Sequence, residues 1–206
     1  QNALLHLRPG LVELPRAGII HRLDKDTTGL MVVAASLEGH TALTRSLAAR
    51  DFLREYQAIA CGVMTAGGKV SAPIGRSSAD RRKMTVREGG RPSVTHYRVI
   101  ERFRAHTHIR LTLETGRTHQ IRVHMAHLRY PLVGDPVYGG RLRMPARASE
   151  QFANALRGFH RQALHAARLG FEHPVTGEPM EWSSPLPQDM VSLLEELKRD
   201  AKALGE

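Results

Sequence analysis

The residues best suited to chemistry lie in the segment HRLDKDTTG at 21–29. Two carboxylates, Asp24 and Asp26, stand there beside the cations Arg22 and Lys25, in a turn that ends with glycine. Nearby positive charge and turn amides keep a carboxylate ionised, and an ionised carboxylate can act as a nucleophile or a general base. Aspartate at a turn also commonly caps backbone amides. Residue chemistry by itself therefore leaves both a catalytic and a structural role open for Asp24.

A basic stretch, GRSSADRRKMTVREGGR at 75–91, is the second candidate feature. Its paired serines and paired glycines predict a loop or hairpin rather than a helix. A basic hairpin beside a site suits contact with a phosphate backbone, although an exposed charged loop without a partner fits the same residues. The side chains that we assign to RNA-backbone contact are Arg76, Arg81, Arg82, Lys83 and Arg87.

The charge of the chain is large and unevenly distributed. Its 206 residues carry 30 Lys and Arg against 20 Asp and Glu, a formal net charge of +10. Residues 1–168 hold 27 of the basic and 12 of the acidic side chains, whereas residues 169–206 hold 3 and 8. Arginine, which pairs bidentately with phosphate and stacks on bases, dominates the basic set. The pattern favours a polyanion-binding face, with an acidic segment turned away from it, over an ordinary solvated surface.

Length and composition are those of one folded domain, which we expect to span residues 1–206. Apolar residues make up 41% of the chain, enough for a buried core, and no apolar run reaches the length of a membrane span. Cys61 is the only cysteine, which rules out an intramolecular disulfide and fits a cytoplasmic location. The first residues lack an initiator Met and a signal-peptide layout, so we expect a fragment of a longer protein.

The hydrophobic pattern predicts the elements that would position these residues in an α+β fold dominated by strands. Short runs at 17–23 and 30–35, rich in Ile and Val, predict strands on either side of the Asp24 turn. Ser36 is a suitable N-cap for a helix that continues to about Arg50. Further elements are strands at 52–60, 93–100 and 106–114, a helix at 118–129, a hairpin at 171–184 and an amphipathic helix at 187–203. In the helix at 118–129, Ile121 and Met125 share the apolar stripe and Arg122 points away from it.

The segment HRLDKDTTG, followed by LMVVAAS, resembles the signature of the RluA/RluD family of pseudouridine synthases, which isomerise uridine to pseudouridine in RNA. The likeness runs from residue 2 to about residue 195, in the order and spacing of the family. It includes REYQA (54–58), the KM-V-EGG stretch (83–90), VTHYRV (94–99), LETGRTHQIRVHMAH (113–127), PLVGDPVYGG (131–140) and QALHA (162–166). The TTG form of the turn is most similar to the RluD branch, which acts on large-subunit ribosomal RNA. This resemblance favours the catalytic role of Asp24 over the structural one.

The resemblance also implies roles for individual residues. Asp24 matches the family's essential aspartate, the proposed nucleophile. Tyr56 matches the tyrosine that stacks on the target uracil, and it is a candidate base at C5. Arg117, or as the alternative Arg122, matches the arginine that pairs with the catalytic carboxylate. Substrate contacts are assigned to Arg22, which helps to extrude the target base, to Ile121 as an apolar pocket wall, and to Thr27, His119 and Arg122.

The resemblance also implies the fold: a mixed, mostly antiparallel sheet with flanking helices and loops. It implies a central RNA-binding cleft with Asp24 on its floor. It implies no metal and no cofactor. The expected partner is a stem-loop of large-subunit ribosomal RNA, free or in pre-ribosomal particles, bound by a monomer. The family's N-terminal S4-like domain and first strand have no counterpart in this sequence. The chemical route stays open between attack at C1′, a glycal formed by loss of the C2′ proton, and attack at C6.

Two other classes of function fit parts of the same pattern. One is a non-catalytic RNA-binding or ribosome-assembly module, and the other is a hydrolase that uses the Asp24/Asp26 pair. A zinc site is not expected at His119, His124 and His127, because no acidic or cysteine ligand stands near them.

Overall fold

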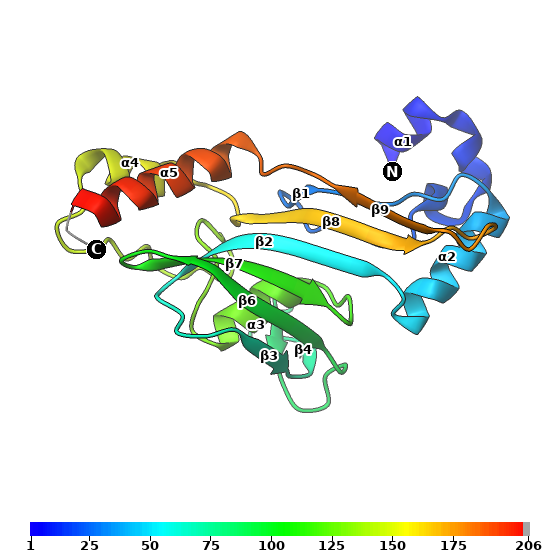
Figure 1. Ribbon diagram of the computed structural model, residues 1–206. Coiled ribbons are helices and arrows are strands. Elements are labelled where there is room, and N and C mark those ends of the chain that lie inside the picture. Colours follow the sequence, from blue (N-terminus) through cyan, green and yellow to red (C-terminus); the bar gives the residue numbers. More distant parts are fainter. Residues whose placement is uncertain (204–206) are drawn as a thin grey trace.

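The computed structural model describes residues 1–203, which form a seven-stranded sheet with helices on both faces (Figure 1). The strand order is β1-β8-β2-β7-β6-β3, with β9 beside β8. Only β1 runs parallel to its neighbour, which confirms an α+β fold with a mixed, mostly antiparallel sheet. The strands are β1 (Thr28–Gly29), β2 (Leu53–Cys61), β3 (Gly68–Ser71), β6 (Val94–Arg102), β7 (His106–Leu113), β8 (Leu164–Glu172) and β9 (Pro179–Ser183).

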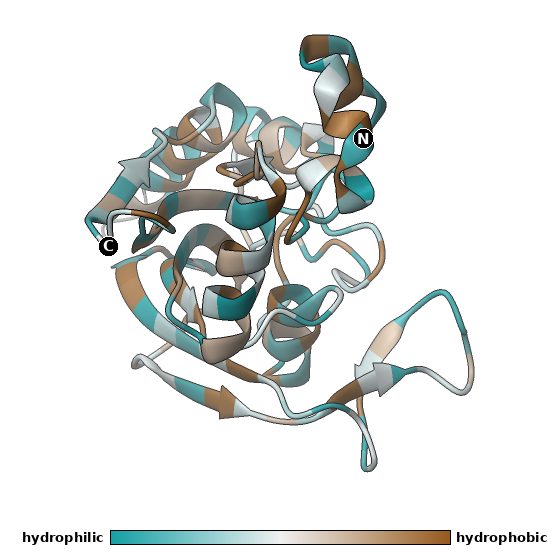
Figure 2. Ribbon diagram, turned by 90° about the vertical axis from the view of Figure 1, so that its right-hand side faces the viewer, coloured by the Kyte–Doolittle hydropathy of each residue, from teal (hydrophilic) through white to brown (hydrophobic). Residues whose placement is uncertain are grey.

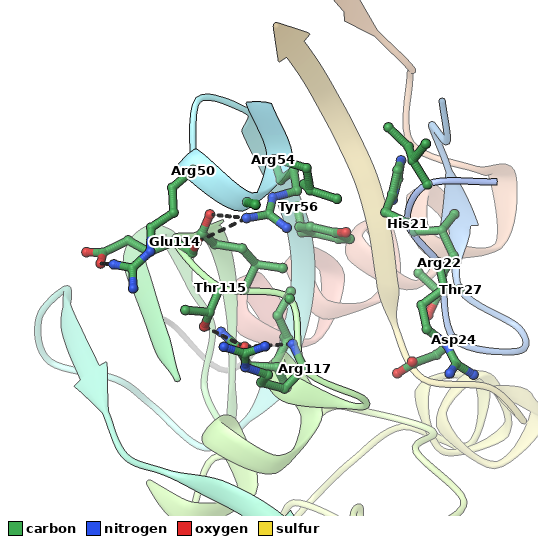
Figure 3. Close-up of a pocket in the computed structure, with 18 of the residues that line it drawn as sticks. His21, Arg22, Asp24, Thr27, Arg50, Arg54, Tyr56, Glu114, Thr115 and Arg117 are labelled. Carbon is green, nitrogen blue, oxygen red and sulfur yellow. Dashed lines mark hydrogen bonds and ion pairs between the residues drawn. The ribbon is translucent and has the colours of Figure 1, made fainter. Parts of the chain in front are cut away.

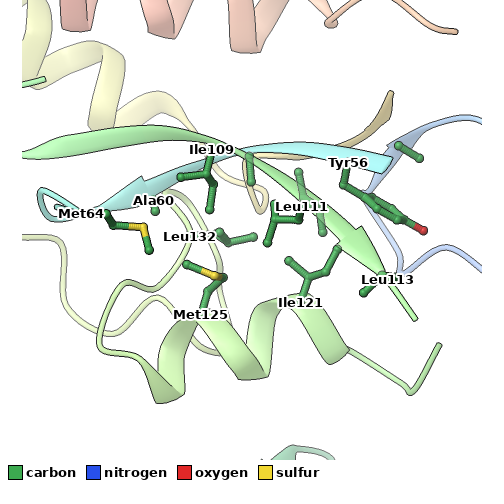
Figure 4. Close-up of a cluster of buried hydrophobic side chains, with 12 residues drawn as sticks. Tyr56, Ala60, Met64, Ile109, Leu111, Leu113, Ile121, Met125 and Leu132 are labelled. Carbon is green, nitrogen blue, oxygen red and sulfur yellow. The ribbon is translucent and has the colours of Figure 1, made fainter. Parts of the chain in front are cut away.

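The central strand β2 contributes to two cores, because successive side chains of a strand point to opposite faces. Tyr56, Ala58 and Ala60 lie in one apolar cluster with residues of helix α3 (Gln120–His127), as Figure 4 shows. Ile59 lies in the other cluster, with helices α4 (Glu150–Gly158) and α5 (Gln188–Ala203). Helix α2 (Leu37–Ala49) packs over a third cluster at the far end of the sheet. The sheet is therefore covered on both faces, and α3 covers the face from which Tyr56 points.

Several elements agree with the sequence analysis. The Ser36 hydroxyl accepts a hydrogen bond from Gly39 N at 3.1 Å, so it caps α2 as predicted. The predicted strands correspond to β2, β6 and β7, and the predicted hairpin to β8 and β9. Helix α5 buries the apolar stripe that its spacing predicted: Met190, Leu193, Leu194 and Leu197.

The strands expected at 17–23 and 30–35 are wrong. This part of the chain contains only the two-residue β1 and an isolated bridge between Ile19 and Val33. Ala17 and Gly18 have φ of 53° and 77°, so the backbone turns where an extended strand was expected. Helix α4 was not predicted, nor were the N-terminal helix α1 (Asn2–Leu7) and the 3₁₀ helices η1 (Pro9–Glu13) and η2 (Pro15–Gly18).

The basic stretch at 75–91 does form a hairpin. Strands β4 (Ile74–Arg76) and β5 (Met84–Val86) pair antiparallel and make a separate two-stranded sheet. Figure 2 shows the hairpin projecting from the body of the molecule, with a hydrophilic tip. Among the described residues, no helix has the length and apolar character needed to cross a bilayer.

Candidate active site

A pocket of about 440 Å³ opens between the Asp24 turn and the adjoining ends of β2 and β7 (Figure 3). Its wall combines residues far apart in the sequence: the turn after His21, the start of β2, the end of β7 and the first turn of α3. Of the residues predicted for the site, those that line the pocket are Arg22, Asp24, Thr27, Tyr56, Arg117 and Ile121. Arg122 and His119 do not line the pocket. Arg122 contacts Asp24, and His119 contacts Tyr138.

The Asp24 turn is held in place by β8 and the residues before it. Asp24 O accepts a hydrogen bond from Thr27 N at 3.0 Å, which closes the turn. The buried Gln162 amide donates to Lys25 O at 2.6 Å and to Thr27 Oγ1 at 2.9 Å. Gly29 has φ of 106°, and a Cβ there would lie 2.2 Å from Ala166 O, so only glycine fits this close approach to β8.

Asp24 belongs to a buried row of alternating charges. Its Oδ2 lies 3.3 Å from Arg122 Nη1, and the side chains of the two residues are 14% and 5% exposed. Arg122 also donates to both carboxylate oxygens of Asp135, at 2.7 and 2.8 Å. Burial alone would raise the pKa of Asp135, but hydrogen bonds from Arg122, Tyr138 N and Val137 N outweigh it and hold that pKa below its usual value. The carboxylate on the pocket wall is therefore backed by a firmly placed guanidinium.

This geometry corrects the choice of the arginine that pairs with Asp24. Arg117 donates its Nε–H to Pro92 O and its backbone N–H to Gln120, so it lines the pocket without reaching Asp24. The pair is made by Arg122, the alternative that the resemblance allowed. The helical pattern placed Arg122 on the outer side of α3, but Asp135 and Tyr138 of the following loop cover that side.

Tyr56 is the aromatic wall of the pocket and is only 7% exposed. Burial raises the pKa of its hydroxyl to about 12; the Arg54 charge works against this, and the Asp24 charge adds to it. The phenol is therefore neutral near pH 7, with its ring on the same wall as Ile121 and Leu164.

The sequence analysis predicts no role for Asp135, Tyr138 or Gln162, although each lies in a segment that carries the resemblance. The ring centroid of Tyr138 lies 5.0 Å from Arg122 Cζ. The hydroxyl of Tyr138 accepts from Met84 N in the basic hairpin at 2.9 Å and lies 2.8 Å from His119 Nδ1. Because these three residues are separated by 19 to 54 positions from one another, residue spacing could not have identified this contact.

The basic hairpin forms a second pocket, of about 590 Å³, next to the first. Arg22 and Arg117 line both pockets, and Arg76, Arg82 and Arg91 add to the positive lining of the second. Asp26 is exposed and lines neither of them, so Asp24 and Asp26 do not face a common site. The hydrolase hypothesis required Asp24 and Asp26 to act as a pair, and the structure does not bring them together.

No group of three His, Cys, Asp or Glu side chains within residues 1–203 could hold a metal ion. His124 is fully buried, and its ring nitrogens contact Thr95 Oγ1 and Ala72 O at 2.9 and 3.0 Å.

Known proteins of similar sequence identify the family of this chain. The family described as RNA pseudouridylate synthase matches residues 7–127, more than half of the chain. The chain belongs to this family. Ribosomal large subunit pseudouridine synthase D of Vibrio parahaemolyticus is 60% identical over 204 residues, and that of Escherichia coli K12 is 60% identical over 199. These matches cover 99% and 97% of the chain but 63% and 61% of the relatives, so the chain spans less than two thirds of their length.

Solved structures of the same family share the fold. Human RNA Pseudouridylate Synthase Domain Containing 4 superposes with a TM-score of 0.74 at 26% identity, over 96% of this chain and 83% of that one. Human RNA Pseudouridylate Synthase Domain Containing 1 superposes with a TM-score of 0.66, also at 26% identity, over 87% of this chain and 79% of that one.

Proposed function

We propose that this chain isomerises uridine to pseudouridine in large-subunit ribosomal RNA, with Asp24 as the catalytic carboxylate. The observation that carries the proposal is that Asp24, which pairs with Arg122, lines a pocket that Tyr56 also lines. Family membership supports the reaction, and the names of the curated relatives support the choice of RNA. No metal or cofactor is needed, since the reaction only moves one bond within the nucleotide. We place this activity in the cytoplasm.

The pocket suits a uridine that has left its helix. Flipping a base costs a few kcal/mol, and stacking on an aromatic side chain such as Tyr56 returns about 1–3 kcal/mol. Exposed Arg22 stands between the two pockets, where it can fill the gap left in the RNA and contact phosphates. The hairpin cations and Arg117 extend the positive surface beyond the pocket mouth.

The test is tritium release from unmodified large-subunit ribosomal RNA labelled at uracil C5, for the wild type and for Asp24→Asn. Attachment of C5 to the ribose releases its hydrogen, so we expect release by the wild type and a loss of at least about 1,000-fold in the variant. Filter binding should give the same Kd for both proteins, because Asn keeps the shape of the side chain. Release by Asp24→Asn at the wild-type rate would rule out the proposed role.

The same experiment separates the other classes of function. A hydrolase would liberate free uracil or sugar, which chromatography of the digested RNA detects, whereas an isomerase retains both. A binding module would hold the RNA without any Asp24-dependent release. Because the curated relatives are longer, the assay is repeated with the N-terminally extended protein; silence there as well would favour the binding module.

A further inference from the structure

Arg54 is a buried cation on the pocket wall, and the proposed mechanism gives it no role. It lies two residues before Tyr56 in β2, so both side chains point to the same face of the sheet. Both line the same pocket, and Figure 3 shows them on the wall across from Asp24 and Thr27. Arg54 is only 6% exposed.

The guanidinium of Arg54 is only partly satisfied by the protein. Its Nη2 donates to Leu113 O at 3.3 Å and to Glu114 O at 3.1 Å. Its Nε is buried without a hydrogen-bond partner, and Nη1 makes no hydrogen bond to residues 1–203. A Cβ at Gly116 would lie 2.9 Å from Nη1, so glycine at that position avoids a close contact with this nitrogen.

Arg54 also lacks a counter-ion in the described part of the chain. The neighbouring carboxylates are engaged elsewhere: Glu55 pairs with cations on the opposite face of the sheet, and Glu114 pairs with Arg50. Burial lowers the pKa of Arg54, Tyr56 opposes this, and the charge of Arg117 adds to it. Arginine nevertheless stays protonated in proteins. A protonated guanidinium buried without a carboxylate is costly, and it is typical of a site that receives an anion from a ligand.

We infer that Arg54 binds an oxygen of the flipped uridine that carries or gains negative charge. This inference rests on the proposed function and deepens it. When the N1–C1′ bond breaks, its electron pair stays on the base, and the negative charge spreads over N1, O2 and O4. Attack of Asp24 at C6 would instead move the C5–C6 π electrons towards O4. Both routes make the base negative, and the charge disappears when C5 bonds to C1′, the C5 proton leaves and N1 is protonated. In the C6 route, the electron pair left by the C5 proton restores the C5–C6 double bond and expels the Asp24 carboxylate from C6.

The charged oxygen has two possible sources, the uracil itself or the phosphate of the same nucleotide. The uracil is favoured, because a base stacked on Tyr56 brings its edge next to Arg54, whereas phosphates can be held at the pocket rim by exposed arginines such as Arg22. Removal of a hydrogen-bond donor that faces a developing oxyanion typically slows turnover by about 100- to 1,000-fold.

The experiment compares wild type and Arg54→Met on an unmodified transcript of large-subunit ribosomal RNA labelled with tritium at uracil C5. Single-turnover release gives the rate, and filter binding at several salt concentrations gives Kd and its salt dependence. A rate at least about 100-fold lower with unchanged Kd supports the inference with uracil as the source. A weaker Kd, with the salt slope reduced by about one, supports it with phosphate as the source. If neither quantity changes by more than about twofold, the inference is overturned.

Two further variants keep this result interpretable. Arg98→Met removes one positive charge from an exposed position of β6, outside the pocket, and should change neither rate nor Kd. Because Arg54 also holds two carbonyls, thermal unfolding checks the fold of Arg54→Met. Should it fail to fold, Arg54→Lys decides. Lys keeps the charge but not the planar set of donors, so we expect release to slow at least about tenfold with uracil as the source; a rate and a Kd that both stay within about twofold of wild type overturn the inference.

Failure of the proposed function would look different. In that case the wild type itself would release no tritium, and the binding measurement alone would decide on Arg54. A weaker Kd with a smaller salt slope in Arg54→Met would still support an anion site, and an unchanged Kd and slope would overturn it.

Discussion

In the row Asp24–Arg122–Asp135, the proposed catalytic carboxylate lies next to a fixed cation. Arg122 makes two short hydrogen bonds to Asp135 and a single longer contact of 3.3 Å to Asp24. Asp135 is in turn fixed by Val137 N and Tyr138 N at 2.8 and 2.9 Å. Because Asp135 holds the guanidinium so firmly, the Asp24 carboxylate is the more loosely held end of the row.

Asp135→Asn tests this arrangement. The variant leaves Arg122 with one carboxylate instead of two, so we expect the guanidinium to shift towards Asp24 and tritium release to fall about tenfold or more at unchanged RNA affinity. Loss of one charge from a buried pair also lowers the free energy of unfolding, by up to about 3–5 kcal/mol. The control is Asp51→Asn at an exposed position, for which neither quantity should change. Wild-type kinetics in Asp135→Asn would show that Arg122 needs no such support.

Tyr56 can be a stacking platform, a base at C5, or both. Its pKa of about 12 leaves little tyrosinate near pH 7, so a rate that depends on tyrosinate should increase as the pH rises from 7 to 9. We expect Tyr56→Phe to bind RNA normally, to release tritium at least about tenfold more slowly and to lose this pH dependence. Tyr56→Ala should in addition weaken RNA binding, because stacking is lost. Normal turnover in Tyr56→Phe would leave Tyr56 as a platform only.

Among the elements, the basic hairpin of β4 and β5 is joined to the site by a side-chain hydrogen bond. The Tyr138 hydroxyl joins Met84 N of the hairpin to His119 at the start of α3, and the ring of Tyr138 lies over Arg122. The hairpin therefore has a fixed base and a charged tip. In the free protein, some of the tip cations already contact the hairpin itself, as Arg76 donates to Arg81 O and Arg82 pairs with Asp80.

Charge reversal at the hairpin tip tests its role in RNA binding. We expect Arg82→Glu combined with Lys83→Glu to weaken binding of large-subunit ribosomal RNA and to reduce the slope of log Kd against log salt by about two or more. Lys202→Glu, at an exposed position of α5, is the matched control and should leave the slope as it is. An unchanged slope in the hairpin variant would place the RNA on another surface.

At the scale of the whole molecule, two buried histidines tie stability to pH. Burial lowers the pKa of His106 and His108 to about 4, and the same side chains titrate near 6.5 in an unfolded chain. Between these values the unfolded chain binds protons that the folded chain does not. Stability is therefore fully present above about pH 6.5 and decreases as the pH falls towards 4, on the order of 2 kcal/mol per histidine at pH 5.

His106→Leu should flatten this dependence. His106 packs edge-on against Phe152 and buries an Nδ1 without a partner, so an apolar side chain suits the position. We expect the change in Tm between pH 7 and pH 5 to be smaller in the variant than in the wild type. The exposed His160→Leu serves as the control. An equal change in Tm for His106→Leu and wild type would mean that other groups cause the acid sensitivity.

Local patterns of residues were sufficient to predict several elements of this protein. Period-two alternation identified β7, helical spacing identified α5, and helical spacing with Ser36 as the cap identified α2, because burial of one face imposes these periods on the chain. Motifs in a fixed order likewise identified the family. They also identified Asp24 and Tyr56 as candidate site residues. The strands expected on either side of the Asp24 turn were wrong, because their apolar residues pack in the core without forming a regular ladder.

The groups that surround Asp24, in contrast, come together only in the folded chain. Its partner is Arg122 rather than Arg117, and that choice depends on the loop that carries Asp135, which no spacing within α3 reveals. The partly unsatisfied guanidinium of Arg54 could not be predicted from the sequence either. It depends on which carbonyl groups lie near the start of β2 and on which pocket Arg54 lines. Ion pairs and hydrogen bonds act over a few ångströms, and here they join residues up to 98 positions apart in the chain, so their partners are settled only when the chain has folded.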